Sequence, residues 1–304
     1  MKPKIVFLVG PTAIGKTDIA LALAKKIKAE IISCDSMQVY RGADILTSKP
    51  PAALRKAIPH HLINMVSADK EYNVSRYYKD VAAKVKEIIG RGKIPLIVGG
   101  TGLYMSILID GIFKSRPICK VRRSRFYKEA ETKGSGYLYS KLKGIDPDAA
   151  LKIHPHDTKR IIRALEVYAA TGKPISSLQR QRQGLKDEYD VKIFCLNMER
   201  DKLYRRIDGR VDKMFIQGAV SEAKKLLKLK LSRTAGYALG IREIKGYLDG
   251  LYDLEEAKRL LKKNTRNYAK RQLTWFRKDK RIQWIEISEK QKPQHIVNRI
   301  VRMF

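Results

Sequence analysis

Residues 10–17 read GPTAIGKT and match the pattern G-x-x-x-x-G-K-[ST]. An apolar run of strand length, residues 5–9 (IVFLV), leads into this stretch, and residues 16–28 after it carry apolar side chains at helical spacing. Strand, glycine loop and helix in this order predict a phosphate-binding loop, because glycines let the backbone amides turn inward and the helix N-terminus adds its positive dipole end. We expect Lys16 to supply a mobile cation and the Thr17 hydroxyl to bind Mg²⁺.

Strands and helices alternate on the C-terminal side of this loop. Further strands are expected at residues 30–33, 95–98 and 191–196, and a helix at residues 75–89. This alternation predicts an α/β fold, with a P-loop NTPase-like parallel sheet flanked by helices and with ligands at the carboxyl ends of the strands.

A helical insertion domain interrupts this pattern. The sequence from about residue 115 to 189 is helix-rich, basic and punctuated by proline and glycine. We therefore expect residues 1–114 to form the first part of the P-loop core, residues 115–189 the insertion, and residues 190–304 a return to the core followed by a basic helical part.

The charge of the chain favours a polyanionic partner. The sequence holds 64 Lys and Arg against 31 Asp and Glu, a formal net charge of +33. Residues 1–110 contribute 17 basic and 9 acidic side chains, and residues 111–304 contribute 47 and 22, so the second part is where a polyanion would bind. A Lys-rich thermophilic surface is the alternative, but thermophiles usually match Lys with Glu.

The remaining composition indicates a cytoplasmic protein that does not enter a membrane. Cys34, Cys119 and Cys195 are far apart, without the paired spacing of a disulfide framework or a zinc site. The apolar run at residues 5–9 is too short for a signal sequence or a membrane span.

A carboxylate follows a strand that we expect beside the phosphate loop. An ATPase or GTPase has an apolar strand ending in a metal-directing Asp, but residues 95–98 lead into glycines and Thr101. Asp35 instead follows residues 30–33 and precedes Ser36, Met37 and Gln38. It could cap a turn, or it could act as a general base for an incoming nucleophile, with the phosphates serving as a handle or a leaving group.

Two basic helices are expected in the second part of the chain. Residues 158–170 begin with Lys159, Arg160 and Arg163, which would be either a solvated surface or phosphate contacts, and this helix should bury Ile161, Leu165 and Tyr168.

The second helix, residues 265–277, carries Arg266, Lys270 and Arg277 largely off its apolar stripe, where they could meet phosphates. Tyr268 and Trp275 could stack on bases, although core packing is favoured for both.

Six stretches in order resemble one family, the bacterial tRNA dimethylallyltransferases (tRNA isopentenyltransferases). They cover nearly the whole chain: GPTAIGKT at 10–17, ISCDSMQVYRGADILTSKP at 32–50, HHLI at 60–63, PLIVGGTGLY at 95–104, DPDAALKIHPHDTKRIIRALEV at 146–167 and YAKRQLTWFR at 268–277. The chain lacks the Cys/His zinc-finger extension of the eukaryotic members, which predicts a bacterial-type enzyme.

The resemblance implies transfer of a dimethylallyl group from dimethylallyl diphosphate to N6 of the adenosine that follows the anticodon in tRNA. It implies a diphosphate site at Gly10, Pro11, Thr12, Ala13, Ile14, Gly15, Lys16 and Thr17, with Mg²⁺ at Thr17. The same motif also serves as an ATP site, but no phosphoryl group is transferred in this reaction.

The resemblance further implies that Asp35 is the catalytic base and that Thr101 assists it. The implied tRNA contacts are Asp35, Ser36, Met37, Gln38, Thr101, Arg123, Lys159, Arg160, Ile161, Ile162 and Arg163. The expected partners are the anticodon stem-loop of tRNA and dimethylallyl diphosphate, and the protein is expected to be a cytoplasmic monomer.

Three rival functions make different predictions. An adenylate isopentenyltransferase would modify free AMP or ADP and would need no large basic surface. A nucleotide kinase would transfer a phosphoryl group from ATP. A non-catalytic, nucleotide-gated RNA-binding protein would keep its function when Asp35 is replaced.

Overall fold

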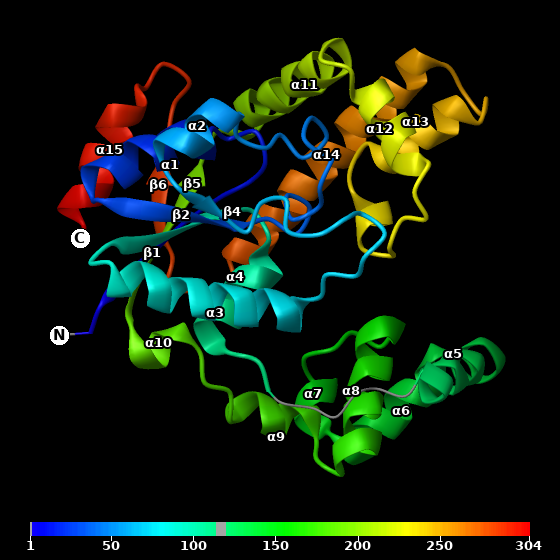
Figure 1. The fold of residues 1–304 in the computed structure, drawn as a ribbon. Helices are drawn as coiled ribbons and strands as arrows, with labels where there is room; N and C mark the ends of the chain where they lie inside the picture. Colours follow the sequence, from blue (N-terminus) through cyan, green and yellow to red (C-terminus); the bar gives the residue numbers. More distant parts are fainter. Residues whose placement is uncertain (1, 114–119) are drawn as a thin grey trace. The chain divides into compact units, whose positions relative to one another are not determined.

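The computed structural model describes residues 2–113 and 120–304 (Figure 1). Cys119 and the expected start of the insertion at residue 115 lie outside this part of the chain. The chain divides into two compact units. The first comprises Met1–Ile109 with Leu185–Phe304, and the second comprises Asp110–Gly184.

A six-stranded sheet forms the centre of the first unit (Figure 1). Its strands are β1 (Lys4–Val9), β2 (Ala29–Cys34), β3 (His60–His61), β4 (Ile94–Gly99), β5 (Asp190–Asn197) and β6 (Gln283–Glu286). Their order is β3-β2-β4-β1-β5-β6, and every neighbouring pair is parallel. The predicted parallel sheet is confirmed. The two edge strands, β3 and β6, were not predicted from the sequence, because both are short and lack a long apolar run.

One positional expectation is wrong. The strand that delivers Asp35, β2, does not pair with β1 beside the phosphate loop, because β4 lies between them. A sequence orders strands along the chain, whereas the sheet orders them by the crossover connections that helices make.

Helices cover both faces of this sheet. They are α1 (Lys16–Lys26), α2 (Ala52–Ala57), α3 (Val74–Gly90), α4 (Gly102–Asp110), α10 (Leu185–Glu188), α11 (Arg200–Ile216), α12 (Ala219–Leu227), α13 (Ile241–Leu248), α14 (Leu254–Phe276) and α15 (Pro293–Arg302), with a short 3₁₀ turn at Ala235–Tyr237. Alternate side chains of β1 supply two cores: Phe7 packs with α3 and α4, and Leu8 packs with α1 and α15. Burial on both faces explains why residues 5–9 of β1 are an unbroken apolar run.

The second unit is helical and has its own core. It contains α5 (Lys120–Lys133), α6 (Ser135–Ile145), α7 (Pro147–Ala150), α8 (Thr158–Thr171) and α9 (Ile175–Arg180). Leu142 and Leu165 are among its buried apolar residues. The insertion expected at 115–189 overlaps most of this unit, but α10 packs with the first unit.

The face of α8 differs in one residue from the expectation. Ile161 and Leu165 are buried, but Tyr168 is 38% exposed, because the buried stripe continues through Val167 instead. Among the described residues, no helix is both long enough and apolar enough to span a membrane.

Candidate active site

The GPTAIGKT stretch forms a tight loop between β1 and α1. Gly15 ends the loop with a φ of 94°, a left-handed conformation that favours glycine, and α1 begins at the next residue. The Lys16 ammonium folds back over the loop and donates hydrogen bonds to the carbonyls of Gly10 (3.0 Å) and Pro11 (2.8 Å). The loop therefore presents its cation at the N-terminus of a helix, as the sequence predicts.

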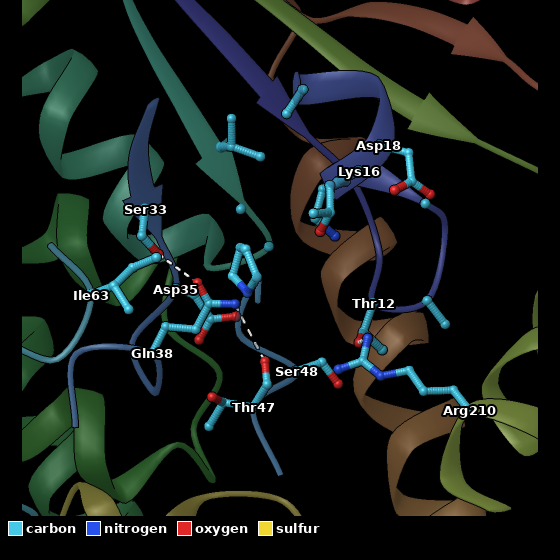
Figure 2. A pocket seen from close by; sticks show the side chains of 18 of the residues that line it. Thr12, Lys16, Asp18, Ser33, Asp35, Gln38, Thr47, Ser48, Ile63 and Arg210 are labelled. Atoms are coloured by element: carbon cyan, nitrogen blue, oxygen red, sulfur yellow. Dashed lines mark hydrogen bonds between the residues drawn. The ribbon is translucent and has the colours of Figure 1, made fainter. Parts of the chain in front are cut away.

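A cavity of about 570 Å³ opens at the carboxyl ends of the strands (Figure 2). Phosphate-loop residues line one part of it and Asp35 and Gln38 line another. The other contributors are α11 and α14, and the lining includes Thr12, Lys16, Thr17, Ser33, Asp35, Gln38, Thr47, His60, Gly99, Gly100, Arg206, Arg210, Lys213, Tyr268 and Gln272. The structure thus brings the loop and the strand-end carboxylate into one chamber.

The Asp35 carboxylate both caps a turn and faces this cavity. Its Oδ1 accepts a hydrogen bond from the Met37 amide at 2.8 Å, which is the turn-capping role. Asp35 also lines the cavity, and in the described part of the chain its Oδ2 has no hydrogen-bond partner. One oxygen can hold the turn while the other accepts a proton, so the two interpretations are compatible.

Thr101 joins the end of β4 to the segment that follows β2. Its amide donates to the Cys34 carbonyl at 3.1 Å, and its hydroxyl accepts from the Ser36 amide at 3.1 Å. Thr101 therefore holds the backbone on both sides of Asp35. Gly99 and Gly100, which precede Thr101, stand at the strand end where an ATPase or GTPase has an Asp.

Gln38 is oriented by two hydrogen bonds. The Ser33 hydroxyl donates to its Oε1 at 2.9 Å, and its own Nε2 donates to the Thr47 carbonyl at 3.3 Å (Figure 2). Ser36 and Met37 are half-buried beside it, and Met37 packs against the core.

Helix α11 supplies cations that were not predicted from the sequence. Arg206, Arg210 and Lys213 line the cavity from one face of this helix. Arg210 donates to the Thr12 hydroxyl at 2.9 Å, and the Arg206 guanidinium lies 3.1 Å from where a Cβ on Gly15 would stand. The signal was present, because basic residues spaced by three and four share one helix face, but nothing in the sequence shows which element that face meets.

Gln272 of α14 was also not predicted, and it connects the two ends of the cavity. Its Oε1 accepts from the Thr12 amide at 2.9 Å, and its Nε2 donates to the Gly100 carbonyl at 2.8 Å. A Cβ on Gly100 would stand 2.1 Å from the Gln272 amide nitrogen, so glycine makes room for this contact. The partners are 260 and 172 residues apart, and no spacing rule reaches so far.

The electrostatics of the cavity favour an anion. Burial and then the nearby Arg210 cation lower the pKa of Lys16 to about 8. Burial likewise lowers the pKa of Arg210. Two cations that are partly stripped of water gain from a bound anion. Burial also raises the pKa of Cys34 and of Cys195 to about 12, so neither thiol is a nucleophile at neutral pH.

The cavity offers oxygen atoms of the kind that bind magnesium, and magnesium binding stays a prediction. Mg²⁺ is usually held by one or two protein oxygens together with substrate phosphates. Thr17 and Asp35 both line the cavity, and both offer oxygen. Among the described residues there is no cluster of three or more His, Cys, Asp or Glu that could hold a metal by itself.

The aromatic residues of α14 differ in their positions. Tyr268 lines the cavity, and burial raises its pKa. Trp275 is exposed: its Nε1 donates to the Ser106 hydroxyl at 3.2 Å, and its ring lies against Gly102. The expectation of core packing is therefore wrong for Trp275.

The basic residues of α14 also differ. Arg266 pairs with Asp208 of α11 at 2.8 Å, whereas Lys270 and Arg277 are exposed.

In the second unit, the predicted tRNA contacts fall into two groups. Lys159 and Arg160 are exposed at the start of α8, where they could meet phosphates, and Arg163 is half-buried over the Phe113 ring. The Ile161 and Ile162 side chains are buried in the core of the unit. These two side chains face inward, and contact of Ile161 and Ile162 with RNA stays a prediction.

Arg123 has a structural partner. Its guanidinium binds the buried Glu166 with two hydrogen bonds, Nε to Oε1 at 2.5 Å and Nη2 to Oε2 at 2.8 Å. This bidentate pair joins α5 to α8. Contact of Arg123 with RNA stays a prediction.

Comparisons with known proteins agree with this geometry. The family model described as IPP transferase matches residues 38–279. Two relatives named tRNA dimethylallyltransferase are each 46% identical: that of Natranaerobius thermophilus over 98% of this chain and 91% of its own length, and that of Carboxydothermus hydrogenoformans over 99% and 97%.

Solved structures show the same fold. The tRNA isopentenylpyrophosphate transferase of Bacillus halodurans is 39% identical, with a TM-score of 0.71 over 99% of this chain and 96% of its own. A eukaryotic dimethylallyltransferase described as acting on tRNA is 30% identical, with a TM-score of 0.83 over 99% of this chain and 80% of its own. The predicted P-loop NTPase-like fold is confirmed, and the chain belongs to the IPP transferase family.

Proposed function

We propose that this protein transfers the dimethylallyl group of dimethylallyl diphosphate to N6 of the adenosine on the 3′ side of the anticodon in tRNA. The observation that carries the proposal is that Lys16 and Arg210 lie across from the Asp35 carboxylate in the same cavity (Figure 2). A transferase that expels diphosphate and deprotonates an amine needs both groups in one chamber. The proposed substrates agree with the names of the relatives.

The cations account for departure of the diphosphate. In the reaction the C1–O bond of the allylic diphosphate breaks and both of its electrons leave with the diphosphate. Lys16, Arg210 and the loop amides would stabilise the charge that develops on the leaving oxygen. A magnesium ion held by Thr17 would add further positive charge to the diphosphate when bound.

The carboxylate accounts for activation of the amine. The N6 nitrogen forms the new bond to C1, and one of its protons passes to Asp35. An adenine amine is a weak nucleophile, so the position of Asp35 matters as much as its basicity. The adenine has to leave its stack to reach a chamber of this kind. Gln38, beside Asp35, would bind an edge of the extruded base.

The charge distribution favours tRNA over a free nucleotide. The second part of the chain, residues 111–304, carries most of the net positive charge, and Lys159 and Arg160 are exposed within it. AMP or ADP would need no such surface. We include in the proposal that the enzyme acts as a monomer and in the cytoplasm, where tRNA is modified.

The test is incubation with labelled dimethylallyl diphosphate and either unmodified tRNA or AMP. We expect label on tRNA only, at N6 of the adenosine 3′ of the anticodon when the nucleosides are analysed. Label on AMP alone would contradict the proposal. Transfer of label from γ-labelled ATP would instead indicate a kinase. An Asp35→Asn protein is the matched control and should bind tRNA while incorporating little label.

A further inference from the structure

A charged side chain outside the cavity, Glu222, holds the loop of residues 44–49, which lies beside the cavity. The Glu222 carboxylate on α12 accepts hydrogen bonds from three successive backbone amides: Asp44 at 2.9 Å and Ile45 at 2.8 Å to Oε2, and Leu46 at 2.9 Å to Oε1. These charge-assisted bonds are stronger than neutral ones. They join two segments that are more than 170 residues apart in the chain.

The other side of this loop is held by a cation. The Lys49 ammonium, which is buried, donates to the Tyr40 carbonyl (2.5 Å), the Asp44 carboxylate (2.9 Å) and the Asn64 side chain (2.6 Å). Burial lowers the pKa of Lys49, and Asp44 and then Glu222 oppose that effect. Residues 44–49 are thus held between an anion and a cation.

The loop ends at the cavity. Thr47 and Ser48 line the cavity, and the Thr47 carbonyl accepts the hydrogen bond from Gln38 Nε2. Gln38 has its other end held by the Ser33 hydroxyl. A direct series of contacts therefore runs from Glu222 through the loop backbone to Gln38, which lies three residues after Asp35.

The diphosphate end of the cavity has separate supports. Gln272 and Arg210 hold Thr12 by hydrogen bonds, and among the described residues neither side chain makes a hydrogen bond to residues 44–49. A change in the loop should therefore alter the position of the base without altering the diphosphate site.

We propose that Glu222 is a positioning residue for the target nucleotide: it fixes the loop backbone whose Thr47 carbonyl orients Gln38 beside Asp35. This inference rests on the proposed function, since it assigns the Gln38 end of the cavity to the adenine. It predicts that Glu222 acts on the reaction of tRNA through Gln38 and leaves the use of dimethylallyl diphosphate unchanged.

The experiment is a double-mutant cycle with Glu222→Gln and Gln38→Ala, measured with unmodified tRNA and dimethylallyl diphosphate. Glu222→Gln should lower kcat/KM for tRNA by about 10- to 100-fold, the size expected when a substrate is displaced by about 1 Å. The KM for dimethylallyl diphosphate and the Kd for tRNA should change by less than about twofold, since the contacts that dominate them are elsewhere. In the Gln38→Ala background, the same change should have little further effect, because coupled residues are not additive.

Two further variants complete the design. Glu222→Asp keeps the charge, but its side chain is too short to reach all three amides, so its kcat/KM for tRNA should lie between the values of wild type and Glu222→Gln. If Glu222→Gln unfolds at the assay temperature, Glu222→Asp replaces it in the cycle. Glu255→Gln, an exposed change at the start of α14, is the matched control and should behave as wild type.

The outcomes separate the two proposals. A wild-type protein that does not prenylate tRNA contradicts the proposed function. If the wild type is active, equal effects of Glu222→Gln in both backgrounds, or a rise in the KM for dimethylallyl diphosphate matching the loss with tRNA, would overturn the positioning role alone.

Discussion

The Asp35 carboxylate divides its two oxygens between structure and chemistry. Oδ1 holds the turn by accepting from Met37, and the residue as a whole lines the cavity opposite Lys16. An Asn at this position retains an oxygen for the turn but has no carboxylate to accept a proton. The structural and chemical roles are therefore separable by one substitution.

We expect Asp35→Asn to lower kcat by about 10²- to 10⁴-fold, the usual contribution of a general base. The thermal midpoint and the Kd for tRNA should change little, because the turn keeps its acceptor. Single-turnover kinetics with a tRNA binding assay would measure both. Asp201→Asn, an exposed change at the start of α11, is the control; an unaltered rate in Asp35→Asn would rule out the base.

Lys16 should give anion binding a pH dependence. Its pKa of about 8 means that the free enzyme loses this cation as the pH rises through 8. The Kd for inorganic pyrophosphate should therefore rise by about tenfold between pH 7 and pH 9. At one pH unit above the pKa, Lys16 is protonated in only about one tenth of the molecules. Calorimetry at pH 7, 8 and 9 measures it.

The Lys16→Arg variant separates the side chain from the ligand, whose own charge also changes with pH. Arginine stays protonated over this range. The variant should show only the titration of pyrophosphate itself. A wild type with the same pH profile as this variant would refute the role of Lys16.

At the scale of elements, α11 turns one face toward the cavity and another toward solvent. Arg210 lies on the first face, where it binds Thr12, and Arg205 on the same helix is exposed. The two arginines therefore form a matched pair.

We expect Arg210→Gln to raise the KM for dimethylallyl diphosphate by about 10- to 100-fold, which corresponds to loss of a charged hydrogen bond of about 1.5 to 3 kcal/mol. Arg205→Gln should have no such effect. Steady-state kinetics with saturating tRNA would decide, and equal effects in both variants would mean that general charge, and not this face, attracts the diphosphate.

A second element-scale feature ties β2 to β3 and to the end of α3. Glu30 is buried, and its carboxylate binds His61 (2.7 Å), Arg91 (2.8 Å) and Lys93 (3.1 Å). Burial by itself raises the pKa of Glu30, but the hydrogen bonds from these three residues outweigh it and lower the pKa to about 2.

Because the folded pKa lies below the unfolded value, the stability from Glu30 is present above about pH 4.5 and is lost as the pH falls toward 2. The loss should amount to about 3.5 kcal/mol at most, given about 1.4 kcal/mol for each pKa unit between 4.5 and about 2. Urea unfolding from pH 6 to pH 2.5 would measure it. Glu30→Gln should be less stable at pH 6 and should lack this part of the pH dependence; parallel profiles would contradict the assignment.

At the scale of the whole molecule, the net charge of +33 acts on any polyanion. The affinity for tRNA should fall steeply with salt, by about 100-fold between 50 and 200 mM if about four phosphates are contacted in duplex regions. Fluorescence anisotropy at several salt concentrations would measure the slope. A flat salt dependence would contradict phosphate binding by the basic part of the chain.

The same titration tests α8 directly. Replacing both Lys159 and Arg160 with Gln should reduce the slope by about two, because each of these cations would neutralise one phosphate. Lys290→Gln, an exposed change near the C-terminus, is the control and should leave the slope unchanged if that residue lies outside the RNA interface. An unchanged slope in the double variant would assign Lys159 and Arg160 to a solvated surface.

Local patterns were sufficient for the sheet and for the phosphate loop. Short runs rich in apolar residues predicted β1, β2, β4 and β5, and the runs of β1 and β4 lead into glycine. A strand that is buried on both faces needs no alternation. The GPTAIGKT loop and Asp35 were identified for a similar reason: each depends on residues next to it in the chain. The two short edge strands had no such signal.

The sequence by itself determined the fold class, the phosphate loop, the carboxylate after β2 and the resemblance that names the reaction. Only the tertiary structure decided that β4 separates β2 from β1, that Arg210 and Gln272 complete the cavity, that Glu222 holds the loop beside Gln38, and that Ile161 and Ile162 point into a core. The physical reason is the separation in sequence of the residues that interact. Backbone conformation and periodicity are set by neighbours a few residues apart, whereas each of these contacts depends on how whole strands and helices pack, and no local spacing records that packing.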